Sequence, residues 1–147
     1  MTANGLRALT PREASIFACF ADAVVAPEPK LPPVRETDAV TFFDDWMVRS
    51  PRANRIGMRA ILYLIEVAPL ATGHRQRLRR LDRGARTDWI EAVQRARNPH
   101  LRLIWKLVKG AAQLAYYGDD RVMRMVGYDA DATVRRGREL RANEGRP

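Results

Sequence analysis

The chain has 147 residues, 26 of them basic and 17 acidic, with a formal net charge of +9 and one cysteine. Hydrophobic residues make up 46%, which is enough for the core of one domain and excludes a chain that is disordered throughout. A single cysteine excludes an internal disulfide. The charge permits nucleic acid, anionic lipid or an acidic protein as partner and does not choose among them.

The first predicted element is a helix that begins in the segment TPRE and stops at Pro27. Thr10 can cap this helix, Pro11 suits its first position, and Glu13 completes a capping box. Helical spacing predicts one buried face, made of Ile16, Phe17, Phe20, Ala21 and Val24. Cys19 lies among these residues, and we interpret it as a small core residue. The segment PEPKLPP then predicts an extended, Pro-rich connector.

A second helix is predicted over residues 37–49. Its apolar side contains Val40, Phe43, Trp46 and Met47. Asp44 and Asp45 are neighbours in this helix, and adjacent helical residues diverge by about 100°. They therefore form no paired-carboxylate site, and we expect both on a solvated face.

A third helix is predicted over residues 51–68, with Ser50 as its cap and Pro69 as its end. Its inward residues are expected to be Ile56, Ala60, Ile61, Leu64 and Ile65. Thr72 and Gly73 predict a turn. The arginine-rich segment HRQRLRRLDRGAR follows over residues 74–86, with Leu78 and Leu81 as its apolar anchors. We interpret it as a short connector helix between core helices.

A fourth helix is predicted over residues 87–97, with Trp89, Ile90 and Val93 inward. The longest helix is expected over residues 99–117. One of its apolar stripes contains Leu101, Ile104, Trp105, Val108, Ala112 and Ala115, and a second contains Leu103, Leu107 and Leu114. Two stripes predict a central helix contacted on two sides. A short helix should close at Gly127.

The sequence as a whole predicts an all-α fold, a single compact bundle-like domain of about five to six helices. We expect a flexible N-terminus over residues 1–8, the helical domain over residues 9–128, and a polar, basic tail over residues 129–147 that is either mobile or draped over a partner. No apolar run is long enough to cross a membrane.

The residues offer no catalytic, cofactor-binding or metal-binding set. His74 and His100 are the only histidines, and neither has a cysteine or carboxylate at ligand or triad spacing. There is no Gly-rich phosphate loop. We therefore expect that the chain is not an enzyme on its own and that its histidines lie at the surface.

The segment LTPREASIFACFADAVVAP, residues 9–27, resembles the opening of the gluconate 2-dehydrogenase subunit 3 family. The residues that fit the family pattern are Leu9, Thr10, Glu13, Ala21, Asp22, Ala23 and Pro27. Residues 107–129 resemble the C-terminal part of the family's sequence pattern. The residues that fit are Leu107, Lys109, Tyr116, Tyr117, Val122, Gly127 and Tyr128. Weaker matches between these segments include the apolar run at 40–46 and Leu62, Leu64, Glu66, Gly73, Leu78, Leu81 and Arg86.

Members of that family are small, or gamma, subunits of FAD-dependent dehydrogenases. The resemblance implies a helical accessory subunit without a cofactor of its own. Its large partner, of the glucose-methanol-choline (GMC) type, would hold FAD and oxidise an alcohol or sugar hydroxyl. The small subunit would stabilise, mature or help export that partner.

Many family members carry a twin-arginine export signal, and this sequence shows none. We therefore expect a cytoplasmic protein that is exported only if a partner carries it, and a cytochrome partner is less expected. Arginine and tyrosine are enriched at interface hot spots. The candidate partner-interface residues are accordingly Arg75, Arg79, Arg83, Arg86, Tyr116, Tyr117 and Tyr128. The alternative for the arginines of residues 74–86 is a solvated face without a partner.

Two other classes of function stay open. A basic helical chain is compatible with a nucleic-acid-binding regulator, although its cations are spread along the sequence and lack interleaved aromatics. A self-contained helical enzyme or small-ligand binder would need a polar constellation that the sequence does not show.

Overall fold

The computed structural model describes residues 5–26, 28–95 and 99–144, of which residues 99–101, 130 and 144 are described by their backbone alone. Within these ranges the protein has seven α-helices, two 3₁₀ turns and no strand, which confirms the all-α fold class. The elements are α1 (Pro11–Val25), η1 (Val34–Glu36), α2 (Ala39–Arg49), α3 (Arg52–Ala71), η2 (Leu78–Arg80), α4 (Arg83–Gln94), α5 (Pro99–Tyr117), α6 (Asp120–Met125) and α7 (Ala130–Glu144).

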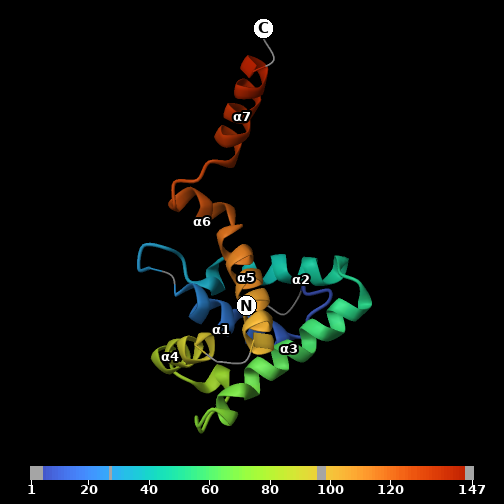
Figure 1. Cartoon of the computed structure of the whole chain (residues 1–147), viewed down its shortest axis with the longest axis vertical. Helices are drawn as coiled ribbons and strands as arrows, with labels where there is room; N and C mark the ends of the chain where they lie inside the picture. The colour runs from blue at the N-terminus through green and yellow to red at the C-terminus, as the bar shows by residue number, and fades with distance from the viewer. Residues whose placement is uncertain (1–4, 27, 96–98, 145–147) are drawn as a thin grey trace.

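Helix α1 is the centre of the fold. It contacts α2, α3, α4, α5 and both 3₁₀ turns (Figure 1). Its predicted apolar face is buried, with Ile16, Phe17, Phe20 and Ala21 fully inside. The prediction that residues 99–117 form a central helix is confirmed in part, because α5 contacts α1, α2, α4 and α6. It is not the longest helix, since it is one residue shorter than α3.

Aromatic rings join the helices around α1. The ring of Phe17 stacks on Phe43 of α2 with centroids 4.0 Å apart. Phe20 meets Trp105 of α5 edge to face at 5.3 Å, and Trp105 meets Trp89 of α4 in the same way at 5.7 Å. Such pairs add about 0.5–1.5 kcal/mol beyond the burial of their area. Two groups of aromatic rings, both beginning on α1, thus connect α1 to α2 and α1 to α5 and α4.

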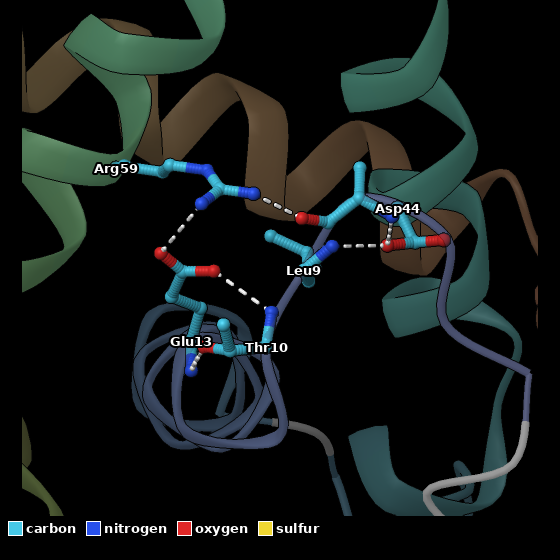
Figure 2. A network of polar contacts seen from close by, with 6 residues as sticks. Leu9, Thr10, Glu13, Asp44 and Arg59 are labelled. Atoms are coloured by element: carbon cyan, nitrogen blue, oxygen red, sulfur yellow. Dashed lines mark hydrogen bonds and ion pairs between the residues drawn. The ribbon is translucent and has the colours of Figure 1, made fainter.

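The capping box at the start of α1 forms as the sequence predicts. The backbone N–H of Glu13 donates to Thr10 Oγ1 at 3.2 Å, and the backbone N–H of Thr10 donates to Glu13 Oε2 at 2.8 Å. The Glu13 carboxylate is buried and pairs with Arg59 of α3, whose guanidinium also donates to the Ala8 carbonyl (Figure 2). A local cap is thereby connected to a second helix.

Asp44 is buried, so the expectation that it lies on a solvated face is wrong. Its carboxylate accepts the backbone N–H groups of Arg7, Ala8 and Leu9 at 2.7, 3.0 and 2.7 Å. Figure 2 shows the bond from Leu9. Burial by itself would raise the pKa of Asp44, but these three hydrogen bonds and the Arg7 charge outweigh it and lower the pKa. Asp44 therefore fastens the segment before α1 onto α2.

Helix boundaries differ from expectation at three places. α3 continues through Pro69 to Ala71, two residues beyond the proline that was expected to end it. Ser50 does not cap α3, since its hydroxyl donates back to the Trp46 carbonyl in α2. The predicted connector helix is a single 3₁₀ turn, and α4 begins at Arg83, where Asp82 caps it through the Ala85 N–H.

Several residues expected in the core are exposed. Trp46 of α2 and Ile56 and Leu64 of α3 all face outward. The second predicted stripe of α5 is also uncovered, with Leu103, Leu107 and Leu114 exposed to 58%, 60% and 63%. The first stripe of α5 is confirmed for Ile104, Trp105, Val108, Ala112 and Ala115, whereas the Leu101 side chain lies outside the described residues. The periodicity of the sequence predicted the apolar faces of the helices correctly. It did not predict which of these faces the rest of the chain covers.

Beyond α5 the chain continues into α6, which still contacts α5, and α7 then projects away from the other helices (Figure 1). A side chain at Gly118 would lie 2.7 Å from the Leu114 carbonyl oxygen, so α5 ends there with a glycine. Gly127 closes α6 with φ 78°, as predicted. Within the tail, Ala130–Glu144 forms α7, a helix that the sequence analysis does not predict, and Asp129 caps it through the Ala132 N–H.

Replacing Asp44→Asn should lower the free energy of unfolding at pH 7 by about 2–3 kcal/mol, because three buried N–H groups lose a charged acceptor. The folded-state pKa is lowered, so the contribution of the carboxylate is present above the ordinary value of 3.8 and is lost as pH falls through the folded value. The difference from wild type should therefore shrink in acid. Urea unfolding followed by circular dichroism at several pH values measures this.

Asp45→Asn is the matched control, since the neighbouring carboxylate is 41% exposed and pairs only with Arg7. Its expected cost is under about 1 kcal/mol. Equal costs for the two variants, or a difference that is independent of pH, would contradict the role assigned to Asp44.

Candidate interaction site around Cys19

The arginine-rich segment is held against the body by two leucines. Leu78 is fully buried and Leu81 nearly so, as the sequence predicts. The turn at Thr72 and Gly73 is confirmed, with Gly73 at φ 93°, and it reverses the chain after α3. η2 then contacts both α1 and α3. The arginines between the leucines are thereby placed along one side of α1.

Arg79 is fixed by a buried carboxylate. Glu66 of α3 is 1% exposed and accepts from Arg79 twice, from Nε at 3.0 Å and from the backbone N–H at 3.3 Å. A buried carboxylate without a partner costs several kcal/mol, so this pairing is a structural requirement. Arg79 therefore positions the segment, in addition to its place among the candidate interface residues.

Two hollows flank Cys19, and arginines line both. The larger, of about 740 Å³, has the arginines Arg75, Arg77, Arg79 and Arg80 in its wall. The smaller, of about 400 Å³, has Arg35, Arg83 and Arg86. Cys19 belongs to both walls and is partly exposed, so its interpretation as a core residue is wrong. The four predicted arginines are brought together, two to each hollow.

Charge is balanced differently in the two hollows. In the smaller one Arg83 approaches Asp22 at 3.9 Å, and Arg86 donates to the Asp82 carbonyl. In the larger one Arg75, Arg77 and Arg80 form no ion pair with any part of the chain that the structure describes. Guanidinium groups without internal partners favour carboxylate or phosphate ligands, which accept two parallel hydrogen bonds. The larger hollow is therefore the stronger candidate for binding an anionic group.

The pKa of the Cys19 thiol depends on burial and on the charged groups around it. Burial is the main influence and raises its pKa. Arg86 and Arg79 act against burial by favouring the thiolate, while Asp22 and Glu66 reinforce it. The net pKa lies above the ordinary value, which favours the protonated thiol at neutral pH.

The three candidate tyrosines lie elsewhere, towards the C-terminal end of α5 and beyond α6. Tyr116 is fully buried and donates its hydroxyl to the Pro32 carbonyl at 2.7 Å, so it holds the Pro-rich connector and cannot contact a partner. Tyr117 and Tyr128 are exposed. Tyr117 lies edge to face on Tyr116, with centroids 5.2 Å apart. The structure thus separates the tyrosines from the arginines and removes Tyr116 from the interface.

Within residues 5–26, 28–95 and 99–144, no group of three His, Cys, Asp or Glu side chains is arranged to hold a metal ion. The side chain of His100 lies outside the described residues, and His74 is half-buried. None of the helices in this part of the chain is both long and apolar enough to cross a membrane.

No family model, curated protein or solved structure matches the chain.

Arg86→Ala should raise the pKa of Cys19 further and slow its alkylation at pH 8, because the strongest influence favouring the thiolate is removed. The rate of iodoacetamide modification, followed by intact-mass spectrometry across pH 7 to pH 10, measures the shift. Arg141→Ala, in the distant α7, is the control and should leave the profile unchanged. Identical profiles for both variants would show that the arginines do not act on the thiol.

Proposed function

We propose that this protein is a non-catalytic accessory subunit that binds and stabilises, or helps to mature, a large FAD-dependent oxidoreductase of the GMC type. The observation that carries the proposal is the set of arginines in the larger hollow, Arg75, Arg77 and Arg80, which lack an internal anionic partner among the described residues. An acidic surface of a second protein supplies the missing carboxylates. FAD and the oxidation of a CH–OH group belong to that partner.

The resemblance of residues 9–27 and 107–129 to small dehydrogenase subunits supports a flavoprotein as the partner. The structure adds a complete hydrophobic core, so the chain folds around its own α1 and can present a preformed surface. A subunit that binds only the folded form of its partner stabilises that form by mass action. Stabilisation therefore needs no catalytic group in this chain.

Charge reversal in the larger hollow tests the proposal. When the tagged chain is purified from cells that also produce its partner, a large flavin-containing polypeptide should co-elute, identified by its flavin absorbance and peptide masses. The double variant Arg75→Glu, Arg80→Glu should weaken this association by about tenfold or more, with unchanged circular dichroism. Arg79 is avoided because its pairing with Glu66 supports the fold.

The matched control is Arg136→Glu with Arg138→Glu, two exposed arginines of α7. It carries the same change of charge and should leave the association intact. If no flavin-containing polypeptide co-elutes, or if the two double variants behave alike, the proposal is wrong.

One observation favours the alternative of nucleic-acid binding. α7 projects from the body and carries four arginines, Arg135, Arg136, Arg138 and Arg141 (Figure 1). In that case the α7 double variant, rather than the variant in the larger hollow, should abolish a mobility shift of DNA or RNA at low salt. The shift should also weaken steeply as salt rises.

A further inference from the structure

Helix α5 presents an apolar stripe to solvent on the face opposite the core. Leu103, Leu107, Leu114 and Tyr117 are all exposed by 43% or more, and Gly110 lies between them. At about 100° per residue these five positions fall within roughly 40° of one line along the helix. A surface helix ordinarily carries polar residues there. The stripe therefore has no role in the described core.

The spacing of the stripe is specific. The intervals from Leu103 to Tyr117 are four, three, four and three residues. This is the a/d pattern of a coiled-coil seam, in which each side chain fits between residues of a facing helix. The pattern continues through four turns without interruption, so the complementary shape is a second helix rather than a loop or a small molecule.

Gly110 occupies the middle of this seam. A glycine inside a helix destabilises it relative to alanine, and a side chain at this position would meet no other atom within 4 Å. The fold of the chain alone therefore gives no reason for glycine here. Close approach of another backbone does, because only glycine leaves that space open.

The charges along α5 determine what kind of helix can occupy the seam. Arg102, Lys106 and Lys109 all project from one flank of the stripe, and the helix contains no acidic residue. Arg102 and Lys106 are exposed and make no ion pair within the described ranges, while Lys109 bonds only to Gln94. A second copy would place like charges along the seam, as would α7 with its four arginines. Neither is complementary.

We propose that the stripe Leu103–Leu107–Gly110–Leu114–Tyr117 of α5 docks an amphipathic helix of a partner protein, one whose apolar a/d seam is flanked by acidic residues. The partner's leucines lie over Leu107 and Leu114, its backbone crosses closest at Gly110, and its carboxylates face Lys106 and Arg102. This inference does not depend on the partner being a flavoprotein, because it follows from α5 alone.

α3 has a similar exposed stripe but is a weaker candidate. Its members at the same spacing are Ile56, Ala60, Tyr63, Val67 and Leu70. Tyr63 is already engaged, since the Arg12 guanidinium lies over its ring at 5.4 Å. The centre of that stripe is therefore partly covered from within the chain, whereas the centre of the α5 stripe is open.

The test uses the full chain and two fluorescent synthetic helices of about three heptads, both with leucine at the a and d positions. One carries glutamate at the e and g positions, and the other carries lysine. Fluorescence anisotropy should show binding of the glutamate peptide, with an affinity that falls as salt rises, and at least tenfold weaker binding of the lysine peptide.

Two substitutions connect the binding to the seam. Leu107→Ser should weaken binding of the glutamate peptide about tenfold or more, because a buried leucine is lost from the contact. Leu140→Ser, at an equally exposed leucine of α7, is the matched control and should have no effect. Gly110→Gln should raise the melting temperature by a few degrees through its better helix propensity and yet weaken binding.

Four results would overturn the proposal. The first is the absence of binding by the glutamate peptide, and the second is equal binding of both peptides. The third is the same loss from Leu107→Ser and Leu140→Ser. The fourth is a dimer in sedimentation velocity that Leu107→Ser disperses, because the seam would then be an interface between copies of this chain. Success of the flavoprotein experiment does not affect any of these readouts, so the two proposals fail separately.

Discussion

The enclosure of α1 by four helices and two 3₁₀ turns is the constraint on which the rest of the structure depends. A helix surrounded in this way cannot leave its first N–H groups or its capping carboxylate to water. Glu13 therefore caps the helix and also pairs with Arg59, and Asp44 receives the backbone of the segment that leads into α1. Polar contacts at one helix end thereby fix α2 and α3 around it.

The same requirement accounts for four acidic side chains inside the fold. Glu13, Asp44, Glu66 and Asp119 are buried, and backbone N–H groups or arginines satisfy all four. Asp119, for example, caps α6 and also accepts the Asp38 N–H at 2.8 Å, which lowers its pKa despite burial. Acidic residues that are buried in the fold cannot form ion pairs with the cations on its surface. The exposed faces of α3 and α5 carry cations and no acidic residue, and in the larger hollow beside Cys19 Arg79 pairs with Glu66 whereas Arg75, Arg77 and Arg80 form no ion pair with the described residues.

Local patterns in the sequence predicted local structure well. They did not predict contacts between residues that are far apart in the sequence. The capping box at Thr10 and the closing glycine at Gly127 act within a few residues, and both are confirmed. Asp44 meets backbone groups 35 or more positions away, and Tyr116 meets Pro32 across 84 positions. The partners of both residues lie too far along the sequence for local spacing to identify them. For the site, the sequence identified four of the arginines but not Cys19 between them.

The exposed leucines show why periodicity alone misjudged α5. A regular apolar stripe indicates that some surface covers it, and the covering surface can equally be another part of the chain or another molecule. In this fold the core is already closed by the opposite face of α5, through Trp105 and Val108. The uncovered leucines and the central Gly110 add nothing to the stability of the chain alone, and the glycine reduces it. An apolar centre with a charged margin is the anatomy of a protein interface. The same sequence pattern therefore specifies folding on one side of α5 and recognition on the other.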